Sequence, residues 1–83
     1  MHIILEGELS FIREVKERRD DNGNVQTPAH QKLQFSFIDA DRGFQLIEVK
    51  DIDRKISHDM VGKIVKIPVQ MSVMDNKLYY RVA

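Results

Sequence analysis

Three adjacent residues, Ser57-His58-Asp59, contain the side-chain types of a nucleophilic catalytic triad. If the segment is helical, consecutive side chains point about 100° apart. They therefore cannot form the serine–histidine–aspartate hydrogen-bonded chain that such catalysis needs. We interpret these residues as a solvated surface and do not expect an enzyme.

Metal-binding patterns are equally weak. Asp39, Asp41 and Gly43 have the spacing that begins a calcium loop, but Lys50 stands where that loop needs a bidentate glutamate. No glycine-rich phosphate loop is present. The histidines are too scattered to indicate a metal site: His2, His30 and His58. We therefore expect no metal and no cofactor.

Basic residues gather on both sides of a turn signal at Asn22-Gly23. A basic hairpin that projects from a barrel can follow a phosphate backbone and close over it. Acidic residues cancel much of this charge, as in an ordinary solvated loop: Glu14, Glu17, Asp20 and Asp21. The segment therefore predicts either a nucleic-acid-binding hairpin or a simple loop. The candidate contacts are Arg13, Lys16, Arg18, Arg19, His30 and Lys32.

Exposed aromatic rings can stack on the bases of a single strand. Tyr79 points away from the apolar face of its predicted strand and shares a face with Arg81. Phe44 begins a strand after a glycine turn, and its direction is ambiguous. The other aromatic residues fall on faces that we expect in the core: Phe11, Phe35, Phe37 and Tyr80.

Alternating apolar and polar residues predict the strands that position these side chains. A long first strand covers residues 2–17, with Gly7 at an inward position where a sharp bend is possible. A helix over residues 9–19 is the competing interpretation. This strand's inward side chains are Ile3, Leu5, Leu9, Phe11 and Val15.

Two further strands follow. One carries Leu33, Phe35 and Phe37 on one face, and the other covers residues 44–50. The alternation of the latter slips between Leu46 and Ile47, as a β-bulge would produce.

A short helix of about ten residues is predicted next, because Ile52, Ile56 and Met60 recur at helical spacing. Asp51 or Asp53 could cap its start, and Gly62 fits its end.

The last third of the chain predicts a long β-hairpin over residues 63–82 with a turn at Asp75-Asn76. Pro68 cannot donate to a sheet ladder, so it predicts an unpaired edge or a bulge. The outward face presents Lys66, Tyr79 and Arg81. The inward residues are Val65, Ile67, Val69, Met71, Val73, Leu78, Tyr80 and Val82.

The predicted order is three strands, a short helix and two strands. It favours a mainly β protein with an OB-type Greek-key barrel of five strands and the helix between the third and fourth. With 83 residues the chain forms one domain. The absence of cysteine fits a reducing cytosol, and no apolar run is long enough to cross a membrane.

The net charge is zero, which disfavours strong binding to nucleic acid through overall charge. The two halves differ, however. Residues 1–41 contain 5 basic and 8 acidic residues, and residues 42–83 contain 8 basic and 5 acidic residues. Charges divided between faces can still create a basic groove.

The run Gly62–Val82 resembles the C-terminal hairpin of the single-stranded DNA-binding (helix-destabilising) proteins of filamentous phages. Residues 44–50 resemble the strand before the short connecting helix of that family, and residues 16–32 lie where the family has its DNA-binding wing. The resemblance implies a five-stranded OB barrel and a homodimer that coats single-stranded DNA in the cytoplasm of a bacterial host. The wing has His30 where family members often carry an aromatic residue.

We therefore expect a sequence-tolerant single-stranded DNA-binding protein that protects exposed strands in replication. The predicted phosphate contacts are Arg13, Lys16, Arg18, Arg19, Lys32, Lys66 and Arg81, with Tyr79 and Phe44 stacking on bases. One alternative is a small β-barrel adaptor that binds protein through the Pro68 edge strand or through the apolar hairpin. Another is an RNA-binding barrel.

Overall fold

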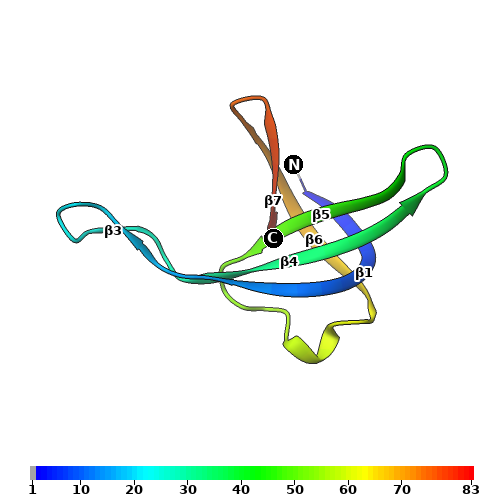
Figure 1. Ribbon diagram of the computed structural model, residues 1–83, viewed down its shortest axis with the longest axis horizontal. Coiled ribbons are helices and arrows are strands. Elements are labelled where there is room, and N and C mark those ends of the chain that lie inside the picture. Colours follow the sequence, from blue (N-terminus) through cyan, green and yellow to red (C-terminus); the bar gives the residue numbers. More distant parts are fainter. Residues whose placement is uncertain (1) are drawn as a thin grey trace.

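The computed structural model describes residues 2–83 and contains a closed barrel of five strands (Figure 1). The barrel strands are β1 (His2–Val15), β4 (His30–Asp39), β5 (Gly43–Asp51), β6 (Ile64–Met74) and β7 (Lys77–Val82). Two short strands, β2 (Arg18–Arg19) and β3 (Val25–Thr27), form a hairpin that projects from the barrel. A 3-10 helix, η1 (His58–Met60), lies between β5 and β6.

The strand order around the barrel is β1-β4-β5-β7-β6. All neighbouring barrel strands are antiparallel except β5 and β7, which pair in parallel. The predicted mainly β, OB-type Greek-key barrel is confirmed. Among residues 2–83, no helix is long and apolar enough to cross a membrane.

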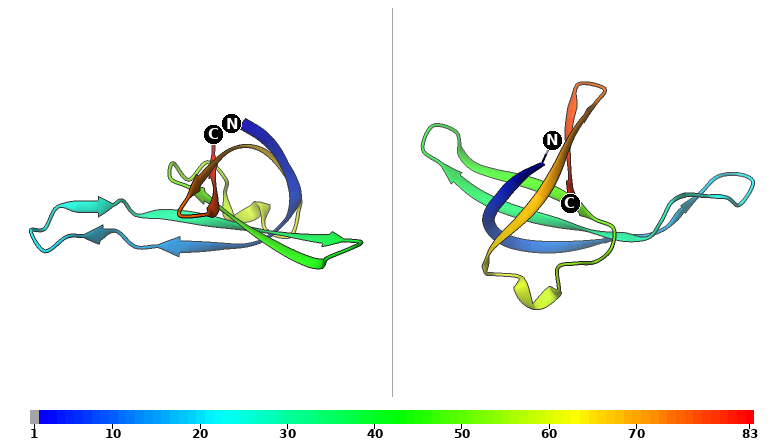
Figure 2. Two further views of the ribbon diagram at one scale, coloured as in Figure 1. Left: turned by 90° about the horizontal axis from the view of Figure 1, so that it is seen from above. Right: turned by 180° about the vertical axis from the view of Figure 1, so that it is seen from behind.

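Strand β1 bends sharply and belongs to both sides of the barrel. Its first half pairs with β6 and its second half with β4, and the ribbon curves between them (Figure 2). Gly7 lies at the bend, where an added Cβ would be 2.5 Å from the ring of Phe37. The missing side chain of Gly7 therefore leaves room for Phe37 to cover the core.

A bulge at Ser10 reverses the faces in the second half of β1. Leu9 pairs with Phe35, but Phe11 already pairs with Gln34. Because of this extra residue, Ile12 is buried and Phe11 is 54% exposed. The prediction that Phe11 belongs to the core is wrong, and so is the alternative of a helix over residues 9–19.

Strand β5 has no bulge, contrary to the prediction. Its register with β4 is continuous from Gly43 to Asp51. Leu46 points outward and is 53% exposed, whereas Ile47 packs against the core. The apparent slip in the pattern was an exposed apolar residue.

The prediction of a ten-residue helix is also wrong, because the helical segment is a single 3-10 turn, His58–Met60. The fully buried Asp51 carboxylate accepts hydrogen bonds from the backbone N–H groups of Lys55 and Ile56, both at 3.0 Å, and from Gln31 Nε2 at 2.8 Å. These bonds satisfy the backbone in a loop instead of a helix. Ile56 and Met60 still pack against the core, as their spacing suggested.

The β6–β7 hairpin extends beyond the barrel. Val65, Ile67 and Val69 are buried, but Val73 near the tip is 68% exposed. Strand β6 pairs with β1 on one side and β7 on the other, so the unpaired edge predicted at Pro68 is absent. The Pro68 carbonyl accepts from Ala83 N at 3.0 Å, just past the end of β7.

The barrel encloses one apolar core. Strands β1, β4, β5 and β6 supply its buried side chains, which alternate with outward polar residues. These are Leu5, Leu9, Ile12, Leu33, Phe35, Val49, Val65, Ile67 and Val69.

Candidate nucleic-acid interface

Four cations lie side by side on the outer face of four neighbouring strands. Arg13 pairs with Lys32, and Lys32 pairs with Lys50. Lys50 then pairs with Arg81 across the parallel β5–β7 junction. We call these four residues the basic row; it ends at Gln70, the partner of Arg81 on β6.

The faces follow from the buried neighbours in sequence. Ile12, Leu33 and Val49 precede or follow row residues and point into the core, so the row points outward because side chains alternate. Adjacent strands are about 4.8 Å apart, and like charges on directly opposite residues destabilise a sheet. The row therefore concentrates positive charge at a cost in stability, which is typical of an anion-binding site.

The row borders a groove of about 790 Å³ between β5 and the β6–β7 hairpin. Lys32, Lys50 and Arg81 line it. The groove lies where β5 and β7 separate on one side of their short parallel pairing. The β4–β5 and β6–β7 hairpins diverge from each other in every view (Figures 1 and 2). The other lining residues are Leu46, Ile47, Glu48, Gln70, Ser72, Met74, Leu78, Tyr79 and Tyr80.

One carboxylate, Glu48, lies beside the row. Its oxygens accept from Arg13 Nε at 3.2 Å, Arg13 Nη2 at 2.9 Å and Gln34 Nε2 at 3.0 Å. Lys32 Nζ is 3.6 Å from the same carboxylate. The hydrogen bond from Arg13 is the largest cause that lowers the pKa of Glu48, and it outweighs the opposing effect of partial burial. The same bond raises the pKa of Arg13.

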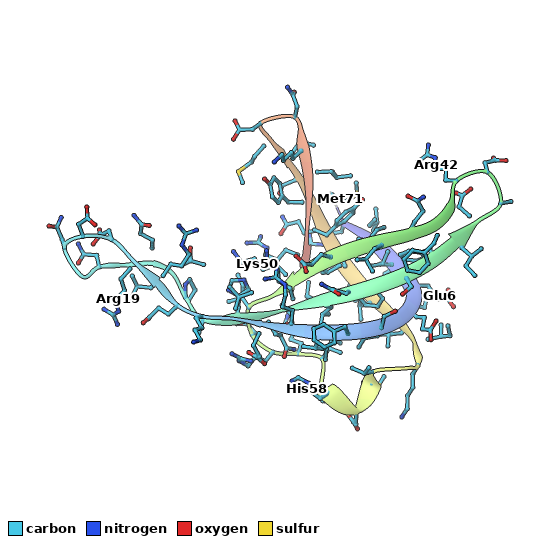
Figure 3. All side chains as sticks on the ribbon, in the orientation of Figure 1. Glu6, Arg19, Arg42, Lys50, His58 and Met71 are labelled. Atoms are coloured by element: carbon cyan, nitrogen blue, oxygen red, sulfur yellow. The ribbon has the colours of Figure 1, made fainter. Side chains whose placement is uncertain are left out.

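The other half of the row has no such counter-ion. Across residues 2–83, neither Lys50 nor Arg81 has an ion-pair partner. Arg81 donates a hydrogen bond to Gln70 Oε1. Lys50 lies between the root of the projecting β2–β3 hairpin and the foot of β7 (Figure 3). The half of the basic row without a counter-ion is therefore at the β5–β7 junction.

Aromatic rings flank the basic row. Tyr79 is 44% exposed and lines the groove two residues before Arg81. Phe11 is exposed on the outer face of β1, two residues before Arg13. Phe44 is 68% exposed but lies near the tip of the β4–β5 hairpin, outside the groove lining. The structure thus brings Tyr79 to the cations and leaves Phe44 at a distance.

The β2–β3 hairpin is ordered at its tip by Asp20. The Asp20 carboxylate accepts from the backbone N–H groups of Asn22 and Asn24, both at 2.9 Å. Arg19 is tied to the hairpin itself, with Glu17 at 3.1 Å and the Gly23 carbonyl at 2.7 Å. Arg18 is exposed.

This hairpin leaves the barrel at the end where β1 stops and β4 begins (Figures 1 and 3). Lys16 follows β1 directly, three residues after Arg13 of the basic row. Lys16 and Arg18 are therefore further cations beyond the end of the row, in a segment that also carries Glu17, Asp20 and Asp21.

Two predicted contacts lie elsewhere. His30 is only 1% exposed, and its Nδ1 pairs with the Pro28 carbonyl at 2.8 Å. The prediction that His30 reaches a nucleic acid is therefore wrong, because its ring is inside the barrel wall. Lys66 is exposed but stands opposite Glu6 at the bend of β1, outside the groove lining. Figure 3 shows Glu6 far along the barrel from Lys50.

Sequence reasoning missed Lys50, Phe11 and Glu48. The alternation of β5 already predicts that Lys50 points outward, because the preceding residue, Val49, is apolar. The cations beside Lys50 could not be predicted, because they come from strands that are distant in the sequence. The adjacent apolar residues Phe11 and Ile12 break the alternation at the bulge, but Leu46 and Ile47 break it in the same way without a bulge, so the pattern alone does not locate one. Among residues 2–83, no three histidine or acidic side chains lie close enough to hold a metal ion.

No protein-family model, curated protein or solved structure matches the chain. The interpretation of the groove therefore depends on its geometry and charge.

Proposed function

We propose that this protein binds single-stranded DNA, without strong sequence preference, along the basic row and the adjoining groove. The observation that carries the proposal is the alignment of Arg13, Lys32, Lys50 and Arg81 across four neighbouring strands. Such a row fits a chain of phosphates, since Lys and Arg neutralise phosphate charge and release counterions. An OB-type barrel with a cationic groove is one of the common frameworks for this task.

Tyr79 supplies the second component of single-strand binding. A base that stacks on an exposed ring contributes about 1–3 kcal/mol. Stacking is tolerant of sequence because every base has an aromatic face. A duplex keeps its bases stacked inside, so the combination of Tyr79 with the row favours single strands.

The β2–β3 hairpin provides further phosphate contacts through Lys16 and Arg18. Because it projects from the end of the row, it can lie along DNA that leaves the groove. The protein would coat and protect exposed strands during replication, as the resemblance to the filamentous-phage proteins implies. That setting is the cytoplasm of a bacterial host.

A titration of three ligands tests the function. Labelled oligo-dT, the corresponding single-stranded RNA and a DNA duplex are titrated in low salt and followed by fluorescence anisotropy. We expect oligo-dT to bind most tightly of the three, and we expect its affinity to fall as the salt concentration rises. Tighter binding of RNA would favour the RNA-binding alternative. If none of the three binds in low salt, the proposal is wrong.

We also propose that two copies associate through the projecting β6–β7 hairpin. Val73 and Leu78 pair across its two strands, share one face, and are 68% and 46% exposed. Contiguous exposed apolar side chains mark interaction surfaces. A domain of this size also gains stability when a second copy buries more apolar area.

Sedimentation measurements test the dimer. The unmodified protein should sediment as a dimer at about 50 µM, which is above the micromolar dissociation constants of weak protein interfaces. The double change Val73→Ser, Leu78→Ser should shift it to monomer. The matched control is Ile38→Ser, which changes a 90% exposed residue on the β4–β5 hairpin. A monomeric unmodified protein would contradict the proposal.

A further inference from the structure

Glu48 is bound by the row in the manner in which a phosphate would be bound. Arg13 contacts both carboxylate oxygens through Nε and Nη2, at 3.2 and 2.9 Å. This two-point contact is the geometry that arginine uses for phosphate as well as carboxylate. Gln34 Nε2, at 3.0 Å, and Lys32 Nζ, at 3.6 Å, complete the surroundings of the anion.

We propose that Glu48 occupies one phosphate position of the groove and competes internally with the bound DNA strand. The inference rests on the proposed function, and it adds an element that sets how tightly and how reversibly the protein binds. Two of the four row cations, Arg13 and Lys32, are held by Glu48 in the free protein. The other two, Lys50 and Arg81, are open to a ligand.

Repulsion among the cations of the row in the DNA-free protein explains why a carboxylate beside them is useful. Arg13 pairs with Lys32 and Lys32 pairs with Lys50, so three cations would repel one another without a counter-ion. Glu48 stands on β5 opposite Gln34, two residues along the strands from the Lys32–Lys50 pair and on the same face. Its charge offsets part of the repulsion in the free state.

The ion pairs are exposed enough to exchange. The side chains of Arg13 and Glu48 are 46% and 32% accessible, and pairs in such surroundings are weak. A phosphate can therefore take over Arg13 and Lys32 at little energetic cost. The displaced carboxylate stays beside the groove, where its negative charge opposes the bound phosphate.

The change Glu48→Gln tests this competition, since it removes the charge and keeps the size. We expect affinity for oligo-dT in low salt to rise about 3- to 10-fold, as expected when one nearby like charge is removed. The slope of log K against log salt should steepen by about 0.7, the value for one more neutralised phosphate on a single strand.

The matched control is Glu14→Gln. Glu14 is also a paired glutamate, bonded to Arg54 Nη1 at 2.6 Å, but it lies outside the groove lining. This variant should bind as the unmodified protein does. If Glu48→Gln leaves the affinity unchanged or lowers it, or if Glu14→Gln gives the same increase, the inference is wrong.

A second measurement separates this inference from the proposed function. Inorganic pyrophosphate is added to each protein and the rise in Tm is recorded, which also reports folding. Glu48→Gln should gain more Tm than the unmodified protein and Glu14→Gln. That result without oligo-dT binding would reject DNA binding as the function, and would keep only the competition between Glu48 and a phosphate for Arg13 and Lys32. If all three proteins bind oligo-dT with equal affinity and pyrophosphate raises their Tm equally, the proposed function stands and the competition by Glu48 is rejected.

Discussion

At the scale of single residues, the candidate site consists of four cations, one carboxylate and an exposed tyrosine. Strand alternation alone predicted that Lys32, Tyr79 and Arg81 would point outward. It could not predict which of them become neighbours, because the row exists only through pairing between strands far apart in the sequence. His30 was misplaced for a related reason: its polarity suggested a surface, but the first residues of β4 are buried.

The adjacent residues Phe11 and Ile12 give a direct test of the side-chain directions in β1. Phe11→Ala should change the free energy of unfolding by less than about 1 kcal/mol, because an exposed side chain contributes little packing. Ile12→Ala should cost about 2–5 kcal/mol, because it removes a buried side chain. Urea unfolding of both variants measures this. The reverse ranking would mean that the bulge at Ser10 is absent.

At the scale of secondary structure, the sequence was most informative where alternation was regular. The five barrel strands, the bend at Gly7 and the closing hairpin were all predictable from it. The ten-residue helix was not, because the spacing of Ile52, Ile56 and Met60 reflects packing against the core and not the backbone conformation. The deciding interaction is made by the buried Asp51 carboxylate, which depends on Gln31 from another strand.

Gly7 makes the bend of β1 compatible with a filled core, which leads to a prediction about stability. In Gly7→Ala, the new Cβ would meet the Phe37 ring at 2.5 Å. We expect unfolding to become easier by about 1–3 kcal/mol, the usual effect of overpacking. Thermal or urea unfolding measures the change.

The matched test of the Gly7 prediction replaces the ring of Phe37 by a smaller side chain. Adding Phe37→Leu to Gly7→Ala should cost less than the sum of the two single changes, since contacting residues are not additive. A Gly7→Ala variant as stable as the unmodified protein would show that Phe37 does not restrict this position.

At the scale of the whole molecule, the zero net charge hides a local cluster of cations. Lys50 of the basic row lies next to the root of the β2–β3 hairpin, far from Glu6 at the bend of β1 (Figure 3). The cluster arises only when the barrel closes, because the row combines residues from β1, β4, β5 and β7. No count of charges along the chain could have located it.

The most direct test of the basic row is the salt dependence of oligo-dT binding. Each cation that no longer neutralises a phosphate should reduce the slope of log K against log salt by about 0.7. The double variant Lys50→Ala, Arg81→Ala should therefore bind more weakly, with a slope smaller by about 1.4. Lys66→Ala, which removes an exposed cation outside the groove, should leave the slope unchanged. Equal slopes for the unmodified protein and the double variant, or an equally reduced slope in Lys66→Ala, would contradict the basic row as the DNA-binding surface.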